Sequence, residues 1–139
     1  MSADVRPATA ADVEAVLTVW AEARSREART PDSAEAVERL LERDPGALLV
    51  AEADGRVVGA VIAGWDGWRG NIYRLGVLPE YQRRGIAGQL VEAGHERLRG
   101  LGARRVTALV GGDEGVAHRL WRALGYRRDE FVHRFVRNL

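Results

Sequence analysis

The chain has 139 residues, which favours one domain over residues 1–139 and is enough to bury a core. Its net charge is +1, all 21 lysine-or-arginine positions are arginine, and this even balance argues against a nucleic-acid binder. The chain has no cysteine, which excludes disulfides and thiolate nucleophiles. Since no apolar run approaches about 20 residues, we expect no membrane span and a cytoplasmic protein.

The N-terminal third predicts one strand and two helices. A short strand should form around Val5, and Thr9-Ala-Ala-Asp12 behind it resembles a capping box. Thr30-Pro31 should open the second helix, because proline is tolerated at a first helical position, and Asp44-Pro45-Gly46 should end it. The first helix is indicated by apolar residues at helical spacing, namely Val13, Val16, Leu17 and Trp20.

The middle of the chain is rich in strands. Residues 48–53 and 57–65 predict two strands on either side of Asp54-Gly55, a pair typical of a tight hairpin turn. A loop with the sequence DGWRG leads to a third strand over residues 71–78, which Pro79 closes. We therefore expect a meander of three antiparallel strands.

The C-terminal half alternates helices with strands. Residues 85–101 carry an apolar helical stripe that ends at Gly102, and residues 104–110 should form a strand. A further helix over 116–124 stops at Gly125, and residues 131–136 alternate as a last strand. The order β-α-α-β-β-β-α-β-α-β predicts an α/β fold with a mixed sheet.

An arginine-glycine turn joins the third strand of the meander to the helix behind it. The first N–H groups of a helix have no intrahelical partner and lie at the positive end of its dipole. Gly85 leaves those amides open, and Arg83 and Arg84 add charge suited to a diphosphate. Neither a P-loop nor a dinucleotide fingerprint fits, since the chain has no lysine and residues 85–88 read GIAG. The alternative is a solvated turn whose arginines face water.

Two motifs resemble the GNAT superfamily of CoA-dependent N-acetyltransferases. Gln82-x-x-Gly85-x-Ala87 resembles the family signature after its fourth strand, and residues 117–126 resemble its A-x-x-L-Y-x-x-L-G-F motif. The element order is similar along nearly the whole chain. GWDGWRG over residues 64–70 is similar to the GYDGHRG loop of some small bacterial members.

The resemblance implies a GNAT fold with a splayed central sheet and acetyl-CoA as the acetyl donor. It implies that the CoA diphosphate lies on the amides of the turn and that the pantetheine arm pairs with the fourth strand like an added strand. The residues so implied for cofactor binding are Leu75, Gly76, Val77, Arg83, Arg84, Gly85, Ile86, Ala87 and Gly88.

The side chains for catalysis are less well marked. The family motif tyrosine that often protonates the leaving thiolate is Trp121 here, and an indole supplies no proton at useful pH. Asn71 stands where some members place a base. Tyr73 and His118 remain as catalytic candidates. The alternatives are that Tyr73 only packs in the core and that His118 is a surface histidine. Alternation along the strand predicts that Tyr73 shares one face with Asn71 and Leu75.

The loop over residues 64–70 is the candidate acceptor site. Trp65, Asp66 and Trp68 could receive a cationic amine through cation–π and ion-pair contacts. The alternative is a hairpin loop whose tryptophans only pack. The three histidines lack metal-ligand spacing, so no metal is expected.

These observations favour an N-acetyltransferase that moves acetyl from acetyl-CoA to a primary amine by direct attack in a ternary complex. The acceptor is a small-molecule or peptide amine, with no nucleic-acid or membrane partner, and the protein is a monomer or homodimer. Two alternatives remain: a non-catalytic CoA-binding module of the same fold, which the residue at position 121 favours, and an arginine-based nucleic-acid binder.

Overall fold

The computed structural model describes residues 3–23, 32–110 and 115–139. The chain forms two compact units, with the boundary between Leu109 and Val110. The expectation of one domain over residues 1–139 stays a prediction.

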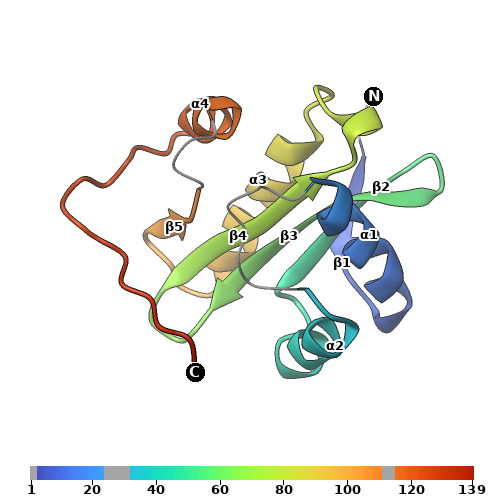
Figure 1. Cartoon of the computed structure of the whole chain (residues 1–139), viewed down its shortest axis with the longest axis horizontal. Coiled ribbons are helices and arrows are strands. Elements are labelled where there is room, and N and C mark those ends of the chain that lie inside the picture. The colour runs from blue at the N-terminus through green and yellow to red at the C-terminus, as the bar shows by residue number, and fades with distance from the viewer. Residues whose placement is uncertain (1–2, 24–31, 111–114) are drawn as a thin grey trace. The chain divides into compact units, whose positions relative to one another are not determined.

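The first unit is built on one five-stranded sheet in the order β1-β2-β3-β4-β5 (Figure 1). Neighbouring strands from β1 to β4 are antiparallel, and β5 lies parallel to β4, so the mixed sheet expected from the sequence is confirmed. The strands are β1 (Asp4–Pro7), β2 (Leu48–Ala53), β3 (Arg56–Trp65), β4 (Gly70–Val77) and β5 (Val106–Ala108).

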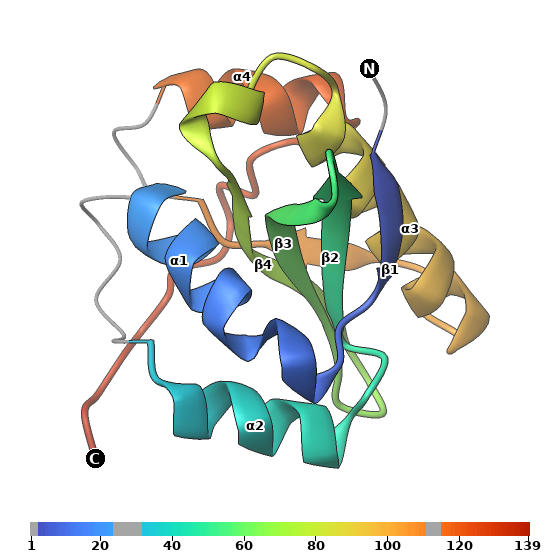
Figure 2. The ribbon, with the colours of Figure 1, turned by 90° about the vertical axis from the view of Figure 1, so that its right-hand side faces the viewer.

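Helices cover both faces of this sheet (Figure 2). A Cβ on Gly76 of β4 would meet Trp20 of α1, whereas a Cβ on Gly59 of β3 would meet Leu90 of α3. The two helices therefore pack on opposite faces, and the middle of the sheet is buried between them. The helices of this unit are α1 (Val13–Ala23), α2 (Ala34–Arg43) and α3 (Ile86–Gly100), with short 3₁₀ turns η1 (Ala10–Asp12) and η2 (Pro79–Tyr81).

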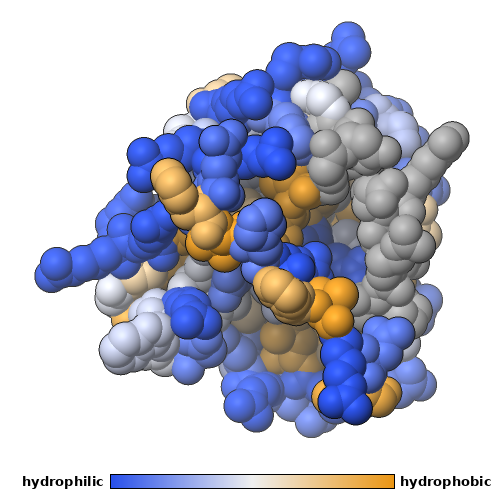
Figure 3. Space-filling view, turned by 60° about the vertical axis from the view of Figure 1, so that its left-hand side comes forward, coloured by the Kyte–Doolittle hydropathy of each residue, from blue (hydrophilic) through white to orange (hydrophobic). Residues whose placement is uncertain are grey.

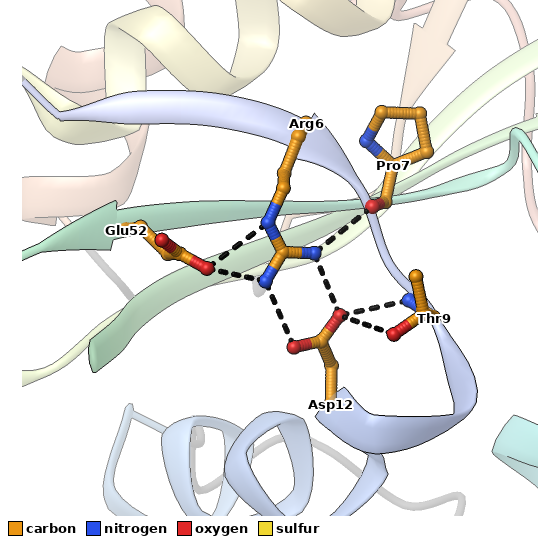
Figure 4. A network of polar contacts seen from close by, with 5 residues as sticks. All are labelled: Arg6, Pro7, Thr9, Asp12 and Glu52. Carbon is orange, nitrogen blue, oxygen red and sulfur yellow. Dashed lines mark hydrogen bonds and ion pairs between the residues drawn. The ribbon is translucent and has the colours of Figure 1, made fainter. Parts of the chain in front are cut away.

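A network around Arg6 fixes the edge of the sheet (Figure 4). The Arg6 guanidinium donates to both carboxylate oxygens of Asp12, at 2.7 and 3.0 Å, and also to Glu52 on β2. Asp12 in turn accepts the N–H of Thr9 at 2.8 Å, which confirms the expected capping box. The hydrogen bond from Arg6 is the main reason why the pKa of Asp12 falls to about 2.

The same edge strand is also joined to α3. The N–H and C=O of Ala3 form a pair of hydrogen bonds with the side-chain amide of Gln89, at 3.2 and 3.0 Å. Gln89 lies in the first turn of α3, so the start of the chain is attached to the N-terminal end of that helix.

The turn between β2 and β3 agrees with its sequence signal, whereas the start of the second helix differs from the expectation. Asp54 and Gly55 both have positive φ, at 53° and 75°, as the tight hairpin between β2 and β3 requires. The second helix begins at Ala34, with the Ser33 side chain accepting the N–H of Ala36 as its N-cap. The expected opening at Thr30-Pro31 lies outside the described residues.

The second unit contains α4 (Gly115–Ala123), which ends before Gly125 at φ 90°. The strand predicted over residues 131–136 is wrong, because this segment has no regular secondary structure. Phe131 and Phe135 are 97% and 93% exposed, and this unit has no other strand among its described residues to pair with them. An alternating pattern forms a strand only where a partner supplies the hydrogen bonds.

One face of the molecule carries mostly polar side chains (Figure 3). Figure 3 shows one face of the molecule, on which hydrophilic residues surround smaller groups of apolar ones. In the described part of the chain, no helix has the length and apolar character needed to cross a membrane.

Candidate active site

The turn after β4 presents unpaired backbone amides at the start of α3. Gln89 makes the first helical hydrogen bond, to the carbonyl of Gly85 at 3.1 Å. The amides of residues 84–88 find no acceptor among the described residues. Gly85 has φ 80°, and a Cβ placed there would meet nothing within 4 Å. The amides therefore open onto free space and can receive an anion.

Side chains hold this turn in shape. The amide of Gln82, the first residue of the signature, donates to the carbonyl of Val77 at 3.1 Å. Arg84 lies over the ring of Tyr81, 4.9 Å from its centroid, and donates to the carbonyl of Glu80. No partner is found for the Arg83 guanidinium among the described residues, so its charge remains available to a ligand.

β4 has a free edge beside this turn. β5 pairs with β4 only over residues 70–72 of β4. From Tyr73 to Val77, that edge of β4 has no strand partner in the described parts of the chain. The segment Leu75–Val77 lies along this free edge, and its role in cofactor binding stays a prediction.

A β-bulge in β4 lies where the free edge begins. Ile62 pairs with Tyr73 and Ala60 pairs with Gly76, so two residues of β4 stand opposite one residue of β3. Arg74 has φ 56°, a left-handed conformation that is uncommon outside glycine. Its carbonyl accepts the indole N–H of Trp20 at 2.6 Å, and its guanidinium pairs with Asp32 at 3.1 Å.

The bulge corrects one expectation from the sequence. Simple alternation would place Asn71, Tyr73 and Leu75 on one face of the strand. Gly76, rather than Leu75, lies on the face that contacts α1, because the bulge inserts one residue after Tyr73. No sequence signal marked the bulge, since a non-glycine residue occupies its left-handed position.

A cavity of about 300 Å³ lies on the other side of Tyr73 from the turn. It is formed by the last turn of α2, the segment leading into β2, the end of β3 and the start of β4. Its lining residues are Leu40, Arg43, Asp44, Ala47, Gly64, Trp65, Asp66, Asn71 and Tyr73. The structure thus brings together Trp65, Asp66 and Tyr73, whereas Trp68 is 83% exposed and does not line the cavity.

Asp66 has a structural role in addition to lining the cavity. Its Oδ1 accepts the N–H groups of Trp68 at 2.7 Å and of Arg69 at 2.6 Å, and so closes the loop. These bonds, that from Arg69 first, lower the pKa of the carboxyl group, so Asp66 is ionised at neutral pH. Its Oδ2 has no partner in the described structure.

Tyr73 is partly buried, with 37% of its surface exposed. Burial raises the pKa of its hydroxyl, which keeps the phenol neutral and able to donate a hydrogen bond near pH 7. Its ring lies against Gly64, where a Cβ would sit 3.4 Å from a ring carbon. The only other titratable side chains of the lining are Arg43, Asp44 and Asp66.

Arg97 of α3 supports the wall of the cavity, a role that the sequence did not indicate. Its Nη2 pairs with Asp44 at 2.5 Å, and its Nε donates to the carbonyl of Ala63 at 3.0 Å. A Cβ on Gly46 would collide with the same guanidinium. The contact therefore fixes the α2–β2 junction against β3.

The remaining candidates lie in the second unit. Trp121 packs edge to face against Tyr126, with ring centroids 4.8 Å apart. His118 lies on the same helix, and a catalytic role for it stays a prediction. Among residues 3–23, 32–110 and 115–139, no group of three histidine or carboxylate side chains could hold a metal ion.

Comparison with known proteins identifies a matching family model and close relatives. The model described as "Acetyltransferase (GNAT) family" matches residues 14–126. An acetyltransferase from Sodalis glossinidius is 36% identical over 122 residues, covering 87% of this chain and 84% of that protein. An acetyltransferase from Pectobacterium atrosepticum is 36% identical over 116 residues, covering 83% and 81%.

Solved structures share the fold at lower identity. The aminoglycoside N-acetyltransferase AAC(6')-Iy in complex with CoA has a TM-score of 0.77 and 23% identity, covering 99% of this chain and 95% of that one. Ard1 from Thermoplasma volcanium has a TM-score of 0.78 and 19% identity, covering 90% and 82%.

Proposed function

The chain belongs to the GNAT acetyltransferase family, whose members use acetyl-CoA, and we propose that it transfers acetyl to a primary amine by direct attack in a ternary complex. The observation that carries this proposal is the row of open amides at residues 84–88 beside the free edge of β4. A diphosphate would accept from those amides, and Arg83 would add charge. The pantetheine arm would extend along Leu75–Val77.

The amine attacks the thioester carbon directly. A C–N bond forms, the C–S bond breaks, and the CoA thiolate takes up a proton while the nitrogen loses its own. A backbone N–H of β4, at Leu75 or Val77, would stabilise the oxyanion. An acyl-enzyme route is disfavoured, because the chain has no cysteine and none of its three serines lies in a GxSxG motif.

Tyr73 is the side chain best placed to assist. It lies between the cavity and the bulge, and its raised pKa keeps the hydroxyl protonated. A neutral phenol there can donate to the developing charge or orient a water that accepts the proton of the amine. Trp65 and Asp66 would hold the acceptor in the cavity.

Two assays test this function. Isothermal titration with CoA measures cofactor binding, and release of free CoA from acetyl-CoA with a panel of primary amines measures turnover. We expect binding and amine-dependent release. Binding without release for any amine would instead support the non-catalytic CoA-binding module.

A further inference from the structure

The cavity beside Tyr73 has charged groups of both signs in its lining. Arg43 is in the last turn of α2, and no partner is found for its guanidinium among the described residues. Asp66 is ionised and keeps one oxygen available. Asp44 does not add a free charge, because Arg97 pairs with it. The wall therefore offers one positive and one negative group to a ligand.

Asp66 lies away from the end of the cavity that is next to the bulge. The register pairs Tyr73 with Ile62 next to the bulge, and Gly70 with Trp65 at the far end of the strands. Three residues of strand separate these levels, which is about 10 Å at the usual rise. Asp66 follows Trp65 and therefore lies at this far end. Arg43 is next to Asp44, and Arg97 joins Asp44 to the carbonyl of Ala63. An acceptor whose amine reaches the bulge must direct its other end toward these groups.

The charge balance selects among acceptors. A polycation would bring a second positive charge against Arg43, and a plain alkylamine would leave both charges without a partner. A remote end that carries both a carboxylate and an ammonium group would match both. A carboxylate can accept two hydrogen bonds from a guanidinium, and an ammonium group can donate to the free oxygen of an aspartate.

We propose that the acceptor is a diamino acid or a close analogue, with its carboxylate on Arg43, its α-ammonium on Asp66 and its ω-amine beside Tyr73. The proposal rests on the proposed acetyltransferase function. The ion pair with Asp66 keeps the α-amino group protonated, and a protonated nitrogen has no lone pair for attack. Acetyl therefore goes to the ω-nitrogen, with one C–N bond formed, one C–S bond broken and one proton released.

Four acceptors of equal chain length separate the two contacts: lysine, 6-aminohexanoate, cadaverine and pentylamine. Lysine has both the remote carboxylate and the remote ammonium group. 6-Aminohexanoate has only the carboxylate, cadaverine has only the ammonium group, and pentylamine has neither. We expect kcat/KM to be highest for lysine and lowest for pentylamine. Mass spectrometry of the lysine product should show acetyl on the ω-nitrogen.

Two variants assign the contacts to residues. Arg43→Gln should lower kcat/KM about fivefold to tenfold for lysine and 6-aminohexanoate only, a range set by a partly exposed charge pair. Asp66→Asn should lower kcat/KM by a similar factor for lysine and cadaverine only. The asparagine retains a side-chain oxygen that can accept the N–H groups of Trp68 and Arg69. Arg39→Gln is the control, because Arg39 is an exposed arginine on the helix of Arg43 and does not line the cavity. It should leave kcat/KM unchanged for all four acceptors.

Titration of the same four compounds into the protein, with and without CoA, gives a readout that requires no turnover. Tighter binding of lysine than of cadaverine and 6-aminohexanoate would support the proposal. Equal binding of all four, or an equal loss for all four in Arg43→Gln, would overturn it. Failure of the acetyltransferase function would appear differently, as absence of CoA release with every amine.

Discussion

Gly85 provides a test of the cofactor site in which backbone strain and ligand contact can be separated. Its φ of 80° lies in the left-handed region, and a Cβ there would meet no protein atom within 4 Å. Gly85→Ala therefore adds conformational strain but no collision inside the protein. Left-handed backbone costs about 1–2 kcal/mol for alanine, and the stiffer unfolded chain offsets part of this.

The net loss in the free energy of unfolding should be about 1 kcal/mol, which lowers Tm by about 3–5 °C in a domain of this size. The loss of CoA affinity should be larger than the loss in the free energy of unfolding. The added methyl group projects into the space that the open amides face, where the diphosphate would lie. We expect Kd for CoA to rise at least tenfold, which is about 1.4 kcal/mol.

Gly102 is the matched control, because it follows the C-terminal end of the same helix. It has φ 107°, and a Cβ there also meets nothing within 4 Å. Gly102→Ala should lower Tm by a similar amount and leave Kd for CoA unchanged. Thermal melts and isothermal titration measure both quantities. Equal CoA affinity in Gly85→Ala and in the parent would show that the diphosphate does not lie on this turn.

Three further predictions concern other parts of the molecule. Trp121→Phe should keep most of the turnover, because an indole is no proton donor; a loss of about 100-fold with intact folding would contradict this. The pKa of Asp12 falls from 3.8 to about 2 on folding, so about 2 kcal/mol of stability is present above pH ~4 and is lost as pH falls through ~2. Urea unfolding at pH 5 and pH 2.5 should show this loss in the parent but not in Asp12→Asn, and equal losses in both would count against it. Trp20→Phe leaves the carbonyl of Arg74 without its donor and should cost about 1–3 kcal/mol; a normal Tm with normal acetyl-CoA kinetics would mean that the bulge does not depend on this bond.

Local sequence signals predicted the elements that short-range chemistry decides. Asp54-Gly55 specified a tight hairpin, and Gly102 ended α3, because both positions need positive φ. At the start of α3 the sequence predicted open amides at Gly85, whereas the positive φ of Gly85 is known only from the structure. The capping box at Thr9 could be read directly from residue spacing.

Features that depend on distant partners could not be predicted in this way. The carbonyl of Arg74 at the bulge accepts a hydrogen bond from Trp20, which is 54 positions away. The contact between Arg97 and Asp44 joins residues 53 apart. The alternation over residues 131–136 suggested a strand, although nothing in the sequence indicated whether a neighbouring strand would be present.

The short first strand has a consequence for how the protein can be handled. β1 is the outer strand of the sheet, and Arg6 and Ala3 attach it to β2 and to α3. Loss of these few residues would leave the row of N–H and C=O groups along β2 open to pairing with another chain, a common route to aggregation. It would also release Gln89 at the first turn of the helix that carries the proposed diphosphate site. A protein truncated before Val13 would then lose solubility and cofactor affinity together.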